Sequence, residues 1–252
     1  MALFVLLHSP LTGLLTWAHV ANELWERGID VVVPGLASDP ETWRAGTTYW
    51  QQHVQQVTES VAQLRSAGPD SADPDEDVVL VGHSGAGVLL PAIGAALERR
   101  VAAYIFCDAD LPQDGASRFD SFTDTDDVES FRRAAVDEML PPFPEAVLEQ
   151  TIPDPGVRAQ FREDLRSTPL EVYEEPIPVP EGWPDAAVAY LGFSKSRDAY
   201  RASIKTAVEG GWTFSELEGA HFHMLVDPGR VARALLDLAR KCGVEVEQEP
   251  AG

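Results

Sequence analysis

Short apolar runs alternate with segments of helical periodicity along most of this 252-residue chain. Residues 2–7 form an uninterrupted apolar run typical of a buried strand, and in residues 15–27 the apolar side chains recur along one helix face. The alternation also predicts strands at 30–33, 77–81, 101–107, 186–191 and 213–217, and helices at 50–67, 85–99, 196–209 and 228–241. Repeated strand–helix–strand units form parallel sheets with helices on both faces, so we expect an α/β fold with a mostly parallel sheet.

The alternation stops between residues 111 and 184, where prolines and acidic residues are frequent and only patches such as 130–140 and 157–165 look helical. An ordered insertion of this length usually carries function. Its aromatic residues favour a packed structure over a disordered loop: Phe131, Phe143, Phe161, Tyr173 and Trp183. We therefore predict a core made of residues 1–110 and 185–245, a helical lid at 111–184 and a frayed tail at 246–252.

The net charge of −22 argues against nucleic acid and anionic membranes as partners, because both attract positive charge. The first residues lack the basic start of a signal peptide, and no apolar run is long enough to cross a bilayer, so a cytoplasmic protein is expected. Two cysteines, Cys107 and Cys242, make neither a disulfide framework nor a zinc site. Frequent arginine and rare lysine are typical of a GC-rich bacterial genome. The oligomeric state stays open.

The segment from Val78 to Gly87 is the strongest indication of chemistry. An apolar strand runs into Gly82, Ser84 lies at the turn, and an Ala- and Leu-rich segment follows at once. Such a turn needs small residues on either side of the serine, so that the serine Oγ stands above the sheet edge. The backbone N–H of Gly85 then points towards a developing oxyanion. A phosphate-binding loop is disfavoured because no lysine follows the glycines.

This segment resembles the nucleophile turn of the α/β-hydrolase superfamily. The family pattern G-x-S-x-G is met except at its last position, where Ala86 replaces glycine and Gly87 follows. The resemblance implies the α/β-hydrolase fold, with a mostly parallel sheet flanked by helices and a helical lid insertion. It also implies that Ser84 is the catalytic nucleophile.

The loop from Glu218 to Pro228 resembles the family stretch that carries the catalytic base, and His221 falls on the family histidine. A serine hydroxyl needs such a neighbour, because it is a poor nucleophile until an imidazole takes its proton. Candidate substrate contacts are Pro10, His83 and His223. For His223, packing beneath the following helix is slightly favoured over the pocket, and an H-x-H zinc site lacks further ligands.

The residue that orients the base is less directly indicated. The family places it after the strand at 186–191 in a G-x-x-D pattern, where this chain has Lys195 in the acid position. Asp108, at the end of the strand at 101–107, is the favoured acid, because some superfamily members place theirs at that strand end. Asp198 is the alternative acid, and a site in which no acid orients the base remains a third option.

The first loop, from His8 to Trp17, resembles the H-G-x-x-x-G-x-W-x-W loop of plant-esterase and hydroxynitrile-lyase-like relatives. In those relatives the residue after H-G donates the second backbone N–H of the oxyanion hole. Here Ser9 replaces the glycine, and the donor position is Pro10, which has no N–H. Losing one donor slows acyl transfer by roughly 100- to 1,000-fold. Either Ser9 Oγ or the Leu11 N–H replaces it, or the alignment is off by one, or the chemistry is not plain ester hydrolysis.

These residues predict an enzyme that cleaves an ester, thioester or lactone of a small to medium apolar substrate. Ser84, His221 and Asp108 would carry the reaction, Gly85 and Ser9 would hold the oxyanion, and a lid would cover a pocket lined by Phe, Trp and Leu side chains. No cofactor or metal is implied, and the expected partner is a small-molecule substrate. The alternatives are a lyase or cyclase that uses Ser84 and His221 as acid–base groups, or a non-catalytic ligand-binding protein.

Overall fold

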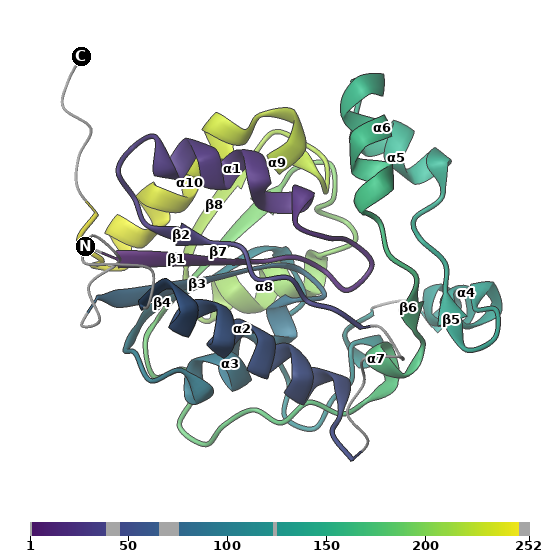
Figure 1. Ribbon diagram of the computed structural model, residues 1–252, viewed down its shortest axis with the longest axis horizontal. Coiled ribbons are helices and arrows are strands. Elements are labelled where there is room, and N and C mark those ends of the chain that lie inside the picture. Colours follow the sequence, from purple (N-terminus) through teal and green to yellow (C-terminus); the bar gives the residue numbers. More distant parts are fainter. Residues whose placement is uncertain (1, 39–45, 66–75, 123–124, 247–252) are drawn as a thin grey trace.

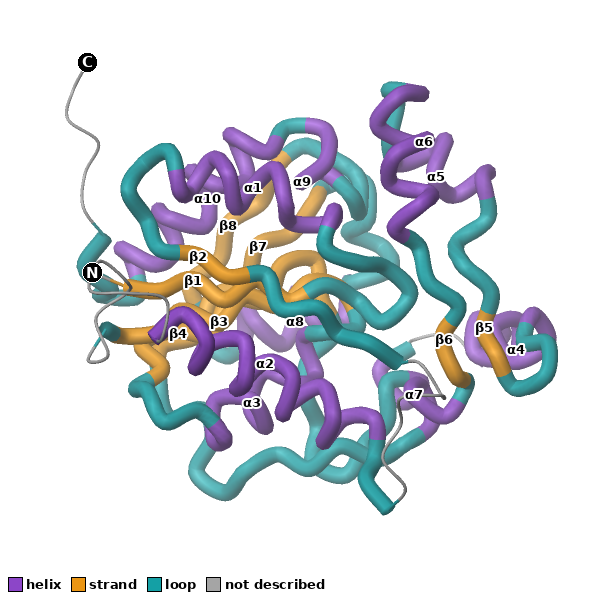
Figure 2. Tube along the Cα trace, in the orientation of Figure 1, coloured by secondary structure: helices purple, strands orange, loops and turns teal. Residues whose placement is uncertain are grey.

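The computed structural model describes residues 2–38, 46–65, 76–122 and 125–246. At its centre lies a six-stranded sheet whose strands are all parallel, in the order β2-β1-β3-β4-β7-β8 (Figures 1 and 2). The predicted parallel α/β architecture is thus confirmed. The strands are β1 (Ala2–Leu7), β2 (Val31–Val32), β3 (Asp77–Ser84), β4 (Val101–Ala109), β7 (Ala187–Phe193) and β8 (Thr213–Leu217).

Helices cover both faces of the sheet because side chains along each strand alternate between them. In β1, Phe4 belongs to the same buried cluster as Trp17, whereas the next residue, Val5, belongs to the cluster on the other face with Val57. One face carries α1 (Leu15–Trp25), α9 (His223–Val226) and α10 (Pro228–Lys241), and the other carries α2 (Tyr49–Arg65), α3 (Leu90–Ala96) and α8 (Arg201–Glu209) (Figure 1).

The strand order creates a topological switch point at the carboxyl ends of β1 and β3. From β1 the chain crosses to β2 on one side, and it then returns to β3 on the other side of β1. Loops leave the sheet in opposite directions at such a point, and ligands of open α/β sheets bind in the crevice between them. The loop that begins at His8 and the strand end at Ser84 therefore meet where a ligand site is expected.

Two helices are shorter than predicted. The segment 85–99 forms a short 3-10 turn, Gly87–Leu89, followed by α3, which ends at Ala96 because the next residue is already extended towards β4. The segment 196–209 becomes helical only at Arg201, because the amide of Lys195 donates to the carbonyl of Gly219 (2.9 Å) and holds the chain in turns. The seven residues before Arg201 thus form a loop at the crevice.

The insertion between β4 and β7 lies at the carboxyl end of the sheet, on the right of Figure 1. The predicted helical patch 130–140 was wrong in its extent, because the helix ends at Ala134 and residues 139–140 pair as a strand with residues 168–169. The division into core and lid stays a prediction. The described elements are η2 (Phe119–Ser121), α4 (Thr125–Ala134), β5 (Met139–Leu140), α5 (Glu145–Thr151), α6 (Pro155–Asp164), β6 (Thr168–Pro169) and α7 (Glu171–Glu174).

The aromatic residues of the insertion pack in three separate places. Phe131, on α4, and Tyr173, on α7, belong to one cluster of rings, and their ring centroids lie 5.9 Å apart. Phe161 lies against Phe222 of the core (5.0 Å), and Trp183 packs against the rings of the sheet face that α2 and α3 cover. Burial of these rings attaches the insertion to the core at several points, because each ring removes a large apolar area from water.

Glu175, which follows α7, joins the insertion to the first turn of α2. Its two carboxylate oxygens accept the backbone N–H groups of Tyr49 (2.8 Å) and Trp50 at the start of the helix. The side chain is 6% exposed. Burial raises the pKa of Glu175 to about 7, against the opposing effects of Arg118 and of the two amides.

The burial of Glu175 predicts a pH dependence of stability. The pKa of Glu175 in the folded protein (about 7) lies above its ordinary value of 4.5. The contribution of Glu175 to the free energy of unfolding is therefore complete below pH 4.5 and is lost as the pH rises through 7. The loss is on the order of 1–3 kcal/mol. Urea unfolding at about pH 5 and about pH 8 measures this loss. From the lower to the higher pH, the free energy of unfolding should fall less in Glu175→Gln than in wild type. Glu174→Gln, at an exposed neighbour, is the control, and equal losses in all three proteins would refute the assignment.

Candidate active site

Ser84 lies at a strained turn at the end of β3. Its φ is +55°, a left-handed conformation that a serine rarely adopts and that is typical of a functional turn. Behind Ser84 the backbone of Asp110 comes so close to Gly87 that a Cβ on Gly87 would lie 2.2 Å from the Asp110 carbonyl oxygen. The turn therefore needs its second glycine at Gly87, and Ala86 is accommodated as a buried methyl group.

His221 and Asp108 form a hydrogen-bonded pair beside this turn. His221 Nδ1 donates to Asp108 Oδ2 at 2.7 Å, and Asp108 Oδ1 accepts the backbone N–H of Phe193 at 3.1 Å. Asp108 is fully buried, with a φ of +46°. The alternative acid, Asp198, is exposed and pairs with Arg201 instead, so the expected contact between Asp108 and His221 is the one present.

His83 supports this pair from behind. Its Nε2 donates to the backbone carbonyl of His221 at 3.0 Å, and the two rings lie 4.4 Å apart. Burial lowers the pKa of His83 well below its ordinary value, so the ring is neutral. Because it is wholly enclosed, His83 holds the loop of the base in place and does not face the cavity, contrary to its prediction as a substrate contact.

Tyr200 is the residue at this site that sequence reasoning missed. Its hydroxyl lies 3.2 Å from Ser84 Oγ, and its ring stacks on His221 with centroids 5.4 Å apart and planes at 17°. Among the described residues, Ser84 Oγ has its hydrogen bond with Tyr200 and none with His221. Such contacts often tighten only when substrate binds. The sequence signal was slight: Tyr200 lies in the loop after β7, where the family places its acid.

The loop after β1 brings Ser9 and Pro10 to the same place. His8 Nδ1 donates to the carbonyl of Ser9 (2.9 Å), and its Nε2 accepts the N–H of Leu36 (3.2 Å), which fixes the loop. A Cβ built on Gly85 would lie 3.7 Å from Pro10 Cδ. In proline this carbon occupies the position of an amide hydrogen, so a methylene group faces Gly85 where a donor would otherwise be.

Arg118, from the insertion, fixes the turn from the other side. Its Nε donates to the carbonyl of Gly85 at 3.0 Å and its Nη1 to that of Val172 at 2.5 Å. The side chain is fully buried. A buried guanidinium is costly unless hydrogen-bonded, so these contacts couple the insertion to the residue after Ser84.

A cavity of about 260 Å³ opens over these groups. Its lining surface is mostly apolar, as predicted, but serines and carboxylates accompany the Phe and Tyr rings, and the expected Trp and Leu side chains are absent from the described lining. Burial raises the pKa of Asp110, one of these carboxylates, to about 6. The lining residues are Ser9, Ser84, Gly85, Asp110, Ser121, Phe122, Asp127, Phe131, Phe143, Tyr173, Ser196, Ala199, Tyr200 and His221.

Pro10 and His223, the other predicted substrate contacts, do not line this cavity. Pro10 borders a separate hollow of about 540 Å³ next to Arg166. The His223 ring packs against Phe193 (5.6 Å) at the start of α9, so the packing alternative for this histidine is the one observed. His223 therefore makes no contact with a substrate at Ser84, and Pro10 approaches the site only through its Cδ, which faces Gly85.

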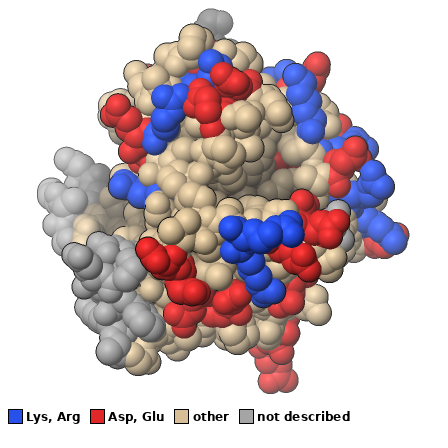
Figure 3. Space-filling model, turned by 90° about the vertical axis from the view of Figure 1, so that its right-hand side faces the viewer, with Lys and Arg blue, Asp and Glu red and all other residues tan. Residues whose placement is uncertain are grey.

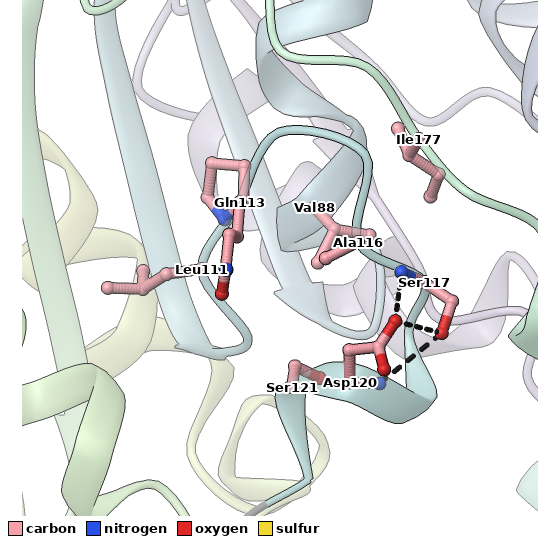
Figure 4. A pocket seen from close by; sticks show the side chains of 9 residues that line it. Val88, Leu111, Gln113, Ala116, Ser117, Asp120, Ser121 and Ile177 are labelled. Atoms are coloured by element: carbon pink, nitrogen blue, oxygen red, sulfur yellow. Dashed lines mark hydrogen bonds between the residues drawn. The ribbon is translucent and has the colours of Figure 1, made fainter.

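A hollowed face and a second, much smaller cavity surround this site. The face that carries the insertion is hollowed near its centre, with acidic and basic side chains around the hollow (Figure 3). A smaller cavity behind the site, between Leu111 and Ile177, measures about 20 Å³ and has room for little more than one water (Figure 4). There Asp120 is already satisfied by the N–H and hydroxyl of Ser117, both at 2.7 Å.

No group of three or more His, Cys, Asp or Glu side chains in the described part of the chain is placed to hold a metal ion. No described helix combines the length and apolar character needed to cross a membrane.

Comparison with known proteins identifies the family. A sequence comparison with curated proteins finds no match. An extracellular α/β-hydrolase from Paenibacillus superposes with a TM-score of 0.76 at 19% identity, covering 94% of this chain and 99% of its own. Tomato methylketone synthase I with 2-tridecanone superposes with a TM-score of 0.71 at 14% identity, covering 95% of this chain and 98% of its own. An Arabidopsis methylesterase superposes with a TM-score of 0.67 at 17% identity, covering 96% of this chain and 100% of its own. A family model described as "Alpha/beta hydrolase family" matches residues 4–234. The chain therefore has the α/β-hydrolase fold and belongs to the alpha/beta hydrolase family.

Proposed function

We propose that this protein is a serine hydrolase that cleaves an ester, thioester or lactone through Ser84, His221 and Asp108. The observation that carries the proposal is the 2.7 Å hydrogen bond between His221 and the buried Asp108, beside a serine held at φ +55°. A base oriented by a buried acid next to a serine on a strained turn is the arrangement that activates a hydroxyl for acyl transfer.

In the first half of the reaction Ser84 Oγ bonds to the substrate's acyl carbon, and the carbonyl π electrons move to its oxygen. His221 Nε2 takes the hydroxyl proton, and Asp108 stabilises the resulting imidazolium through Nδ1. When the carbonyl re-forms, the bond to the leaving group breaks, and His221 returns the proton to that group. The product of this step is an acyl ester of Ser84.

In the second half, water replaces the leaving group. His221 takes a proton from the water as it attacks the acyl carbon, and then returns it to Ser84 Oγ as the acyl bond breaks. In this mechanism the N–H of Gly85, at the start of the turn into α3, donates to the oxyanion in both halves. Arg118 holds the Gly85 carbonyl and so limits rotation of that residue.

The mixed lining of the cavity narrows the substrate class. Its volume of about 260 Å³ suits a small acyl compound, and the rings of Phe122, Phe131 and Phe143 offer apolar contact. Asp110 and Ser121 add polar groups, so the substrate carries a hydroxyl, amine or similar donor beside its apolar part.

A second candidate is non-hydrolytic chemistry, in which Ser84 and His221 exchange protons with the substrate without acylation. The observation that favours it is the methylene group of Pro10 that faces Gly85 where acyl transfer would use an N–H. An elimination or cyclisation builds up less charge on a carbonyl oxygen, so it tolerates the loss of the second N–H donor better.

A fluorophosphonate probe tests the proposal, because it reacts only with an activated serine. Wild type should be labelled at Ser84, and Ser84→Ala should not be labelled. Ser38→Ala is a matched control, because Ser38 Oγ also lies against a histidine, His53 (2.9 Å). Burial lowers the pKa of His53 to about 3, which makes it a poor base, so this variant should label as wild type does. Labelling that persists without Ser84 would refute the proposal.

A further inference from the structure

We propose that the Tyr200 hydroxyl is the second oxyanion donor of this enzyme, in the role that Pro10 cannot fill. The inference rests on the proposed acyl-transfer function and adds a catalytic residue to it. It begins from two observations: the Pro10 methylene group that faces Gly85, and a phenol whose oxygen lies 3.2 Å from Ser84 Oγ.

The position of the hydroxyl suits the task. In the tetrahedral intermediate the oxyanion is carried by the carbon bonded to Ser84 Oγ, so a donor in contact with Oγ is within reach of it. Tyr200 lines the cavity together with Gly85, and the two approach Ser84 from different elements, the loop before α8 and the turn after β3. Preorganised donors of this kind stabilise charge as it develops without a cost of reorganisation.

The protonation state of Tyr200 also suits a donor. Burial, together with the negative charges of Asp110 and Asp108, raises the pKa of Tyr200 well above its ordinary value. The phenol therefore keeps its proton at neutral pH and can donate it in a hydrogen bond.

The tyrosine is held in place by its neighbours. Its ring stacks on His221 at 17°, and its backbone N–H donates to Ser196 (3.2 Å) within the loop. Ser9, the other candidate donor, already shares a side-chain hydrogen bond with Tyr173. Tyr200 is therefore the side-chain hydroxyl in direct contact with Ser84 Oγ, and Ser9 is one step removed.

The variant Tyr200→Phe tests the inference, because it deletes the hydroxyl and keeps the stacked ring. With p-nitrophenyl butyrate as substrate, kcat should fall roughly 100-fold with little change in KM, and the rate of phosphonylation by a fluorophosphonate should fall in parallel. Tyr104→Phe is the control, because its hydroxyl donates to Asp185 (2.8 Å) away from the cavity, and it should react as wild type does. Ser9→Ala should have a smaller effect than Tyr200→Phe.

A double variant ties the effect to Pro10. Pro10→Ala supplies a backbone N–H, and it should raise the rate of Tyr200→Phe by a larger factor than it raises the wild-type rate, because the two donors serve one oxygen. Equal factors in the two backgrounds, or a Tyr200→Phe variant as fast as or faster than wild type, would overturn the role of Tyr200 while Ser84 is still labelled. Failure to label Ser84 in wild type would instead refute the proposed function.

Discussion

Replacing Ser84 with alanine should abolish turnover, with a loss in kcat on the order of 10⁶-fold if the acyl-enzyme route operates. The reason is that no other described hydroxyl occupies a strained strand end beside the paired His221 and Asp108. The measurement is steady-state hydrolysis of p-nitrophenyl butyrate, together with a thermal unfolding curve. Alanine removes only the Oγ, so the fold should remain.

The strained backbone at Ser84 also predicts how the alanine variant folds. Because Ser84 has a φ of +55°, alanine is no better suited to the turn than serine, and the melting temperature should change little. Ser38→Ala should keep wild-type activity. A Ser84→Ala protein that folds and still turns over substrate at the wild-type rate would exclude Ser84 as the reacting group.

Replacing Asp108 with asparagine should lower kcat by about 10⁴-fold. The amide cannot stabilise the imidazolium, and its NH₂ group would favour the wrong tautomer of His221. Asparagine is the right test because Asp108 has a φ of +46°, a conformation that asparagine tolerates. The amide oxygen of asparagine can still accept the N–H of Phe193, which Asp108 Oδ1 accepts in the wild type.

Asp198→Asn is the matched control for the acid, because Asp198 is exposed and paired with Arg201. Its activity should match that of wild type. The opposite pattern, with Asp198→Asn impaired and Asp108→Asn intact, would show that the hydrogen bond to Asp108 is not the one used in turnover.

Much of the fold could be predicted from sequence because its signals are local. Apolar runs, helical periodicity and the glycines around Ser84 each report the conformation of their own segment, and the parallel sheet follows from their order. The contact between Asp108 and His221 was also predictable, because some members of the superfamily place their acid at this strand end and the usual acid position holds Lys195.

What escaped the sequence depends on packing between distant segments. Tyr200 contacts Ser84 only because the loop before α8 is held to the loop of His221, and no local pattern records that contact. His83 was expected to face the substrate, yet alternation along β3 turns it into the core against the carbonyl of His221. Part of the cavity lining, including Ser121, Asp127 and Tyr173, comes from an insertion without periodicity, so that part could not be derived in advance.

The most direct test of the central claim is to trap the covalent intermediate. Enzyme mixed with p-nitrophenyl butyrate and quenched in acid before steady state should carry a butyryl group on the peptide that contains Ser84, as peptide mass spectrometry would detect. The group should disappear on longer incubation and should be absent from Ser84→Ala. Turnover of this ester with no acyl group on Ser84 at any time, or with the group on another residue, would contradict the account.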